Sequence, residues 1–243
     1  MLANINLHQL LFIDIETVPE HPDFRSLTKT MQDLWTAKHS LLRTEDESAE
    51  VGYLRRAGVY AEFAKVICVS IGYFKTEKES LKLSFRVKSF YGDHENSLLQ
   101  EFSSLIRKSF DNPERFQFCG HNIREFDVPF ISRRMLINGI TLPEMFDNSG
   151  KRPWQINNID TLQLWKFGDY KNFVSLKLLA EILGVPSSKS DIDGKDVCRV
   201  YWEEKDLKRI VEYCQKDVIT TARLLQKFKG MESTIPEADI VIV

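Results

Sequence analysis

Two carboxylates, Asp14 and Glu16, interrupt the apolar stretch LFIDIETVPE near the start of the chain. Alternate residues of an extended strand point to the same face, so the two acids project side by side. Burying two like charges together is costly unless a cation lies between them. The pair therefore indicates half of a metal site, or a strand end that emerges into water, which is the commoner fate of a lone Asp-x-Glu pattern.

Two further acids occupy positions that a metal site would use. Asp127 follows a short strand in RFQFCGHNIREFDVPF, and Asp217 lies four residues after Tyr213 in EYCQKDV, on the same face of a helix. Each also has an ordinary structural explanation. Asp127 could cap the helix that follows it, and the Tyr213–Asp217 pair could be a solvated helical stripe. The combination with Asp14 and Glu16 makes a shared site the better hypothesis.

The elements that must position these residues are short strands followed by helices. Strands are expected at 10–15, in the hairpin formed by KVICVSIGYF and SLKLSFRVKSFY, and at RFQFCGHN. Helices are expected in HENSLLQEFSSLIRKSF, DVPFISRRMLINGI, SLKLLAEILGV and the long segment that ends at Gly230. This order predicts an α/β fold in which helices flank a mixed β-sheet.

One domain is expected over residues 1–243, since no linker rich in Pro or Gly divides the chain. Residues 21–64 form a helix-prone segment that is longer than a strand-to-strand connection requires, which predicts a helical insertion beside the site or its substrate channel. The tail 231–243 ends in the apolar residues IVIV, and the sequence leaves open whether they form a strand.

Composition limits the classes of partner. The apolar fraction of 43% is typical of a globular protein, and the net charge of −2 gives no global attraction to nucleic acid or to an anionic membrane. The four cysteines lack metal-type spacing and fit reduced thiols. The first apolar run is too short to span a bilayer and is not preceded by a basic leader. A cytoplasmic protein without a membrane partner is expected.

The motifs FIDIETVP, GHNIREFDVPFI, SLKLLAEILGV and EYCQKDV occur in the order found in a known family. They resemble the DEDD exonucleases of the DnaQ-like group, within the ribonuclease H-like superfamily, and specifically the subclass that carries a tyrosine. The resemblance is strongest to the exonuclease domain of family-B DNA polymerases and to stand-alone proteins predicted to be related 3′-to-5′ exonucleases. It extends from about residue 11 to residue 230, and it implies a ribonuclease H-like fold with a five-stranded mixed sheet.

The resemblance also implies a mechanism with two divalent cations. Asp14, Glu16 and Asp217 would hold the ion that activates water, and Asp127 would hold a second ion to which Asp14 bridges. Tyr213 would orient the attacking water through its hydroxyl. An all-carboxylate ligand set suits Mg²⁺ or Mn²⁺ and argues against zinc. These five residues are the expected catalytic set, and the four acids are the expected metal ligands.

The expected substrate is the 3′ end of single-stranded nucleic acid, with DNA favoured over RNA and nucleoside 5′-monophosphates as products. Thr17, Asn122 and Phe126 are the expected substrate-binding residues, with Phe126 stacking on or wedging a terminal base. Asp160 in IDTLQLW is explained by helix capping. Two alternatives remain: a 3′-to-5′ exoribonuclease, and a nuclease-like protein that binds nucleic acid without turnover.

Overall fold

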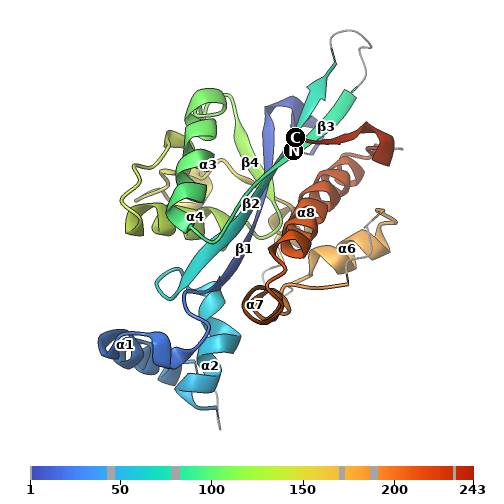
Figure 1. Cartoon of the computed structure of the whole chain (residues 1–243). Coiled ribbons are helices and arrows are strands. Elements are labelled where there is room, and N and C mark those ends of the chain that lie inside the picture. The colour runs from blue at the N-terminus through green and yellow to red at the C-terminus, as the bar shows by residue number, and fades with distance from the viewer. Residues whose placement is uncertain (1, 43–46, 78–82, 170–172, 187–190, 232–233) are drawn as a thin grey trace.

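Six strands form one mixed sheet in the order β5-β4-β1-β2-β3-β6 (Figure 1). The computed structural model describes residues 2–42, 47–77, 83–169, 173–186, 191–231 and 234–243. The strands are β1 (Leu10–Pro19), β2 (Ala64–Thr76), β3 (Leu83–Tyr91), β4 (Gln117–Gly120), β5 (Ile159–Asp160) and β6 (Ile240–Ile242). β1, β2 and β3 pair antiparallel, whereas β4 pairs parallel with β1 and β5 pairs parallel with β4. The predicted mixed α/β architecture is confirmed.

The sheet has one strand more than the five that were expected. The added strand is β6 in the apolar tail, which pairs parallel with β3 through Phe85–Ile240 and Val87–Ile242. The Val243 N–H also donates to the Val87 carbonyl at 2.9 Å. An unpaired edge exposes a row of backbone donors and acceptors, and a β-branched run is a good partner for it. The tail thus covers the β3 edge.

Helices lie on both faces of the sheet (Figure 1). α3 (Glu95–Ser109) and α4 (Asp127–Ile137) lie on one face and α8 (Leu207–Phe228) lies along the other. The remaining helices are α1 (Lys29–Ser40), α2 (Ala49–Arg56), α5 (Thr161–Lys166), α6 (Leu176–Ile182) and α7 (Val197–Arg199), which continues into a π-helical turn at Val200–Glu204. In the ranges that the structure describes, no helix is both long enough and apolar enough to cross a bilayer.

The alternation of side chains along β1 decides which face of the sheet carries the acids. Ile13 and Ile15 belong to the core shared with α3 and α4, whereas Phe12 belongs to the core under α8. Asp14 and Glu16 have the same parity as Phe12, so both carboxylates lie on the α8 face. The site is therefore expected between β1 and α8.

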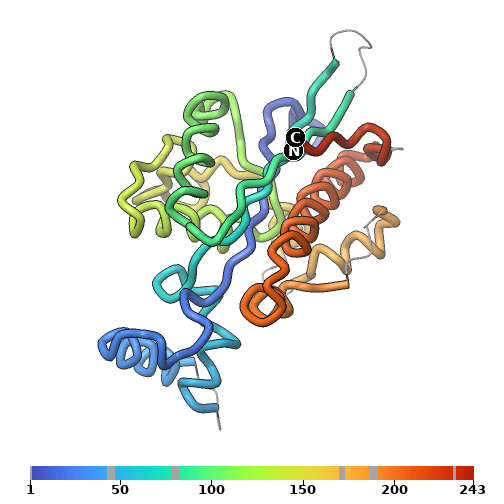
Figure 2. Tube along the Cα trace, in the orientation of Figure 1, coloured from blue at the N-terminus to red at the C-terminus, as the bar shows by residue number. Residues whose placement is uncertain are grey.

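Helices α1 and α2 lie within residues 21–64, and they project from one end of the long β1–β2 ribbon (Figure 2). Its helices α1 and α2 pack around Trp35, which is fully buried and donates its indole N–H to the Ala49 carbonyl at 2.7 Å. The other buried members of this cluster are Leu27, Tyr53, Ala57 and Phe63. The segment thus has a small core of its own, next to the end of β1 that follows the acids.

Candidate active site

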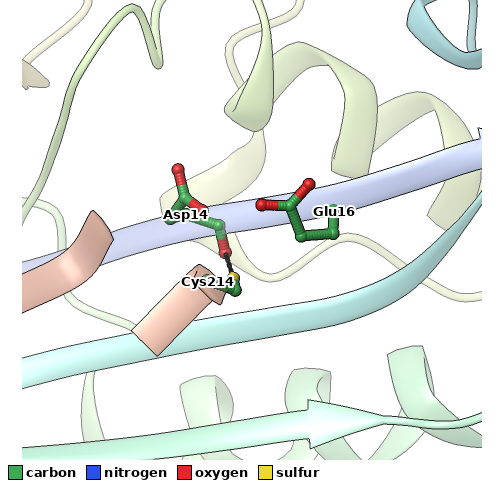
Figure 3. Close-up of side chains that lie close together, drawn as sticks. All are labelled: Asp14, Glu16 and Cys214. Atoms are coloured by element: carbon green, nitrogen blue, oxygen red, sulfur yellow. Dashed lines mark hydrogen bonds between the residues drawn. The ribbon is translucent and has the colours of Figure 1, made fainter. Parts of the chain in front are cut away.

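Asp14 and Glu16 lie side by side on β1, facing Cys214 of α8 (Figure 3). One carboxylate oxygen of each acid and the Cys214 sulfur all lie within 4.8 Å of one another. The Cys214 thiol donates to the Asp14 backbone carbonyl at 3.4 Å, and this contact fixes α8 against the strand. Glu16 is buried and Asp14 is half-buried. Burial removes the explanation that the pair merely emerges into water.

Asp127 reaches the same strand from the start of α4. Its carboxylate Oδ1 accepts the Ile15 N–H at 3.0 Å, between the two acids of β1. The simple capping role considered for Asp127 is wrong, because α4 begins at Asp127 and Phe126 holds the cap position without a side-chain hydrogen bond. The physical reason is that β4 pairs with β1 only as far as Phe12, so the Ile15 N–H needs another acceptor.

Asp217 and Tyr213 complete the cluster from α8. Tyr213 and Asp217 lie one turn apart, and the Tyr213 hydroxyl donates a hydrogen bond to the Asp217 carboxylate. Both side chains are half-buried. Asp14 and Glu16 form the tight centre of the cluster, and Asp127, Tyr213 and Asp217 lie close enough to interact electrostatically with Asp14. The five residues come from β1, the start of α4 and the middle of α8.

The electrostatics of the cluster are unfavourable for four ionised acids. Burial, and then repulsion from Asp127 and Asp217, raise the pKa of Asp14 well above its ordinary value. Burial and repulsion from Asp14 and Asp217 do the same to the pKa of Glu16. Burial raises the pKa of Asp127 to about 7, against hydrogen bonds that stabilise its charged form, and raises the pKa of Asp217 to about 6. A bound cation would relieve this repulsion.

The donors present fit a hard divalent cation. Asp14 Oδ2 is buried and has no hydrogen-bond partner in the described part of the chain, so one strong acceptor faces the cluster unused. The carboxylate oxygens around it suit Mg²⁺ or Mn²⁺. Cys214 does not alter that choice, because burial raises the pKa of its thiol and its proton is directed to the Asp14 carbonyl. The site is thus built for oxygen coordination.

Millimolar Mg²⁺ or Mn²⁺ is expected to raise the melting temperature of the protein. Folding raises the pKa of these acids, so their ionisation at pH 7.5 disfavours the native state, and a cation that binds only the native state offsets that cost. At a hundredfold excess over the dissociation constant the gain is about 2.7 kcal/mol, or about 5–10 °C for a chain of this size. Thermal melts measured with metal and with EDTA test this.

The Asp14→Asn variant is the matched control for these melts. It should be more stable than the wild type in EDTA, since one repelling charge is gone, and should gain little from the cation. An equal rise in melting temperature in both proteins would place the stabilising ion elsewhere.

Two of the three residues expected to bind substrate, Thr17 and Phe126, line a cleft that begins at Glu16, whereas Asn122 does not line it. Glu16, Thr17 and Phe126 lie on the wall of this cleft, which has a volume of about 820 Å³. Phe126 is half-buried and packs against the Phe130 ring with centroids 5.3 Å apart. The Thr17 hydroxyl donates to the Gly58 carbonyl at 2.7 Å and so ties β1 to the turn Ala57–Val59 after α2. The helical insertion therefore forms one side of the cleft.

The Asp160 side chain holds the loop that contains Asn122, a role that the sequence does not reveal. The Asp160 carboxylate accepts the N–H groups of Leu162 at 2.9 Å, as predicted for a helix cap, and also those of Asn122 at 2.9 Å and Arg124 at 3.1 Å. Asn122 has a left-handed backbone with φ 66°, a conformation that asparagine tolerates well. Its own Oδ1 is buried without a hydrogen-bond partner in the described ranges. Asp160 thus holds the loop between β4 and α4.

Comparisons with known proteins identify a family and a similar fold. Residues 59–241 match a family model described as a predicted 3′-5′ exonuclease related to the exonuclease domain of PolB. That range contains Asp127, Tyr213 and Asp217, while Asp14 and Glu16 precede it. No characterised protein in a curated collection matches the chain.

The fold is similar to that of a solved polymerase, the family B DNA polymerase from the hyperthermophilic archaeon Pyrobaculum calidifontis. The superposition has a TM-score of 0.57 and 18% sequence identity, and it covers 90% of this chain and 24% of the polymerase chain. At that identity the likeness shows the fold alone. The chain corresponds to about a quarter of the polymerase.

Proposed function

This chain belongs to the family of predicted 3′-5′ exonucleases related to the exonuclease domain of PolB, and we propose that it shortens single-stranded DNA from the 3′ end. The products are nucleoside 5′-monophosphates, and the cofactors are two Mg²⁺ or Mn²⁺ ions. The observation that carries the proposal is the convergence of Asp14, Glu16, Asp127 and Asp217 beside an unused buried carboxylate oxygen. The hydrogen bond from the Ile15 N–H explains the position of Asp127 alone, so the convergence of all four acids supports a shared role.

The four carboxylates are assigned as the metal ligands. Asp14, Glu16 and Asp217 would hold one ion, and Asp127 together with Asp14 would hold the second. When bound, such ions lower the pKa of a water nucleophile and neutralise charge on the phosphate and the leaving 3′ oxygen. The protein positions the ligands rigidly, since two come from one strand and the others are fixed by hydrogen bonds to β1 and Tyr213.

Tyr213 acts through a hydrogen bond. Burial, followed by repulsion from the carboxylates of Asp217, Glu16 and Asp14, raises the pKa of Tyr213 above its ordinary value in the metal-free protein, so the phenol keeps its proton at neutral pH there. A protonated phenol cannot serve as a base. Its hydroxyl donates to Asp217, and its oxygen orients the attacking water by accepting a hydrogen bond from it.

Replacing Tyr213 with phenylalanine is expected to leave residual activity, because the metal ligands remain in place. Loss of one orienting group costs on the order of 10²–10⁴-fold in rate. Single-turnover digestion of a 5′-labelled oligonucleotide measures this loss. Tyr91→Phe removes an exposed hydroxyl from β3 and is the matched control, expected to retain full activity. Full activity in Tyr213→Phe would remove the residue from the mechanism.

The class of reaction is tested with strands of one sequence in several forms. Linear single-stranded DNA should yield a ladder that shortens from the 3′ end and should release mononucleotides, whereas a circular strand has no end and should persist. Cleavage of the circle would show an endonuclease and overturn the proposal. Faster digestion of the matched RNA strand would assign an exoribonuclease, since discrimination depends on contacts to a 2′-hydroxyl.

A further inference from the structure

A second cavity adjoins the cleft that leaves the active site. Its volume is about 330 Å³, and Trp202, in the π-helical turn after α7, lines both spaces. The residues around the second cavity are Lys65, Asp93, Tyr201, Trp202, Lys205 and Leu207. Lys65 lies two residues before Ile67 on β2, so both side chains point to the same face of the sheet. Ile67 packs with Tyr201 and Val200 on the face that also carries the acids. The cleft and the second cavity thus share one wall.

Two lysines give this second cavity its charge. Lys65 is half-buried, and its ammonium donates to the Tyr201 hydroxyl at 3.0 Å, which in turn donates to Asp93 at 2.7 Å. In the described ranges, neither Lys65 nor Lys205 forms an ion pair with a carboxylate. The cationic side chains that line the cleft beside the acids are instead paired with carboxylates. Arg199, for example, lies 3.6 Å from Asp196. Burial lowers the pKa of Lys65 against the attraction of nearby carboxylates, the largest from Asp93 in the same cavity, which the Tyr201 hydroxyl separates from the ammonium.

The aromatic ring between these lysines is held in place. The Trp202 indole N–H donates to the Pro19 carbonyl at 3.2 Å, at the end of β1. The Lys65 and Lys205 ammonium groups lie 4.9 Å and 5.0 Å from the centre of its ring. Lys205 has a left-handed backbone with φ 59°, where glycine would be less strained. Two unpaired ammonium groups therefore lie around one fixed indole.

We propose that Lys65, Lys205 and Trp202 form a subsite for the phosphodiester backbone of the substrate strand, on the 5′ side of the scissile bond. The inference rests on the proposed function, since a 3′ terminus at Asp14 leaves every other nucleotide on its 5′ side. The strand leaves the acids along the cleft past Phe126 and reaches the shared Trp202 wall. Cationic grooves combined with aromatic side chains bind single strands without reading their sequence.

The double variant Lys65→Ala/Lys205→Ala tests the subsite through strand binding. Anisotropy of a 5′-fluorescein dT12, measured in EDTA so that the strand stays intact, should show affinity reduced on the order of tenfold at 50 mM salt. The slope of log affinity against log salt should fall by about 1.4, which corresponds to two lost phosphate contacts on a single strand. With Mg²⁺, kcat/KM should fall for dT12 and stay unchanged for dT3.

Two further variants keep this test decisive. Lys88→Ala/Lys108→Ala removes the same charge from another cavity, beside α3, and should bind dT12 like the wild type. Lys205→Gly removes the ammonium and relieves the left-handed strain, so it should raise the melting temperature while it weakens dT12 binding. That pair of results would exclude loss of folding as the cause.

The possible results distinguish failure of the subsite proposal from failure of the proposed exonuclease function. The subsite proposal would be overturned if Lys65→Ala/Lys205→Ala bound dT12 with wild-type affinity and salt slope. An equal loss of affinity in Lys88→Ala/Lys108→Ala would also overturn it. In both cases activity on dT3 would still support the exonuclease proposal. A wild-type protein that digests neither strand would overturn the exonuclease proposal, and the EDTA binding data would then still decide whether these lysines hold a strand.

Discussion

The Asp14→Asn variant is expected to lose at least about a thousandfold in rate, which places its activity below ordinary detection. The substitution keeps the size of the side chain but removes the charge that is assigned to both ions. Charge stabilisation by bound metal is worth several kcal/mol, and each 1.36 kcal/mol is tenfold in rate. Digestion of a 5′-labelled single strand under single-turnover conditions, with Mg²⁺ and then with Mn²⁺, measures the loss.

A matched substitution distinguishes this loss from an effect of charge alone. Asp33→Asn neutralises an exposed acid on α1 that pairs with Lys29, and it should digest the strand at the wild-type rate. Asp14→Asn should also melt in a single transition at or above the wild-type temperature in EDTA, which would show that the fold is intact. An Asp14→Asn protein that retained a tenth of the activity would remove Asp14 from the metal site.

Part of the arrangement of the candidate site follows from local geometry that is visible in the sequence. Alternation along a strand places Asp14 and Glu16 on one face, and a spacing of four on a helix places Tyr213 beside Asp217. Neither inference needs knowledge of distant contacts. The hairpin and the long final helix were predicted for the same reason, since the apolar period is visible in the sequence.

The features that escaped prediction all depend on contacts between segments that are distant in the chain. The Asp127 carboxylate accepts a hydrogen bond from the Ile15 N–H of β1 instead of capping its own helix, because β4 stops pairing with β1 before Ile15. The tail strand forms because it pairs with the edge of β3, and no local pattern in the sequence specifies that pairing. Asp160 caps its helix as expected, but the loop that it also holds lies about 40 residues earlier. That residues 1–243 fold as a single domain stays a prediction.

Glu95 offers a test of that single-domain prediction, because its ion pair joins parts that are distant in sequence. Arg134 of α4 contacts Glu95 through Nη2–Oε2 at 2.5 Å and Nε–Oε1 at 2.9 Å, and both side chains are buried. Arg134 also donates to the Ala61 carbonyl in the helical insertion at 2.9 Å, and Glu95 accepts the Val66 N–H of β2 at 2.7 Å. One charge pair thus connects the insertion, the sheet and two helices.

Glu95→Gln is expected to lower the free energy of unfolding by about 3–5 kcal/mol, because it leaves the Arg134 charge buried without a partner. The melting temperature should fall by about 6–20 °C, and urea unfolding followed by circular dichroism and by tryptophan fluorescence should give coincident transitions. Of the four tryptophans, Trp35 alone lies in the insertion, so the fluorescence is measured in a background in which the other three are phenylalanine. Coincidence then means that the insertion unfolds with the sheet. Glu50→Gln, which breaks the exposed pair with Arg25, should cost less than about 1 kcal/mol. A separate early fluorescence transition in Glu95→Gln would instead show that the insertion is an independent folding unit, joined to the sheet by this buried pair.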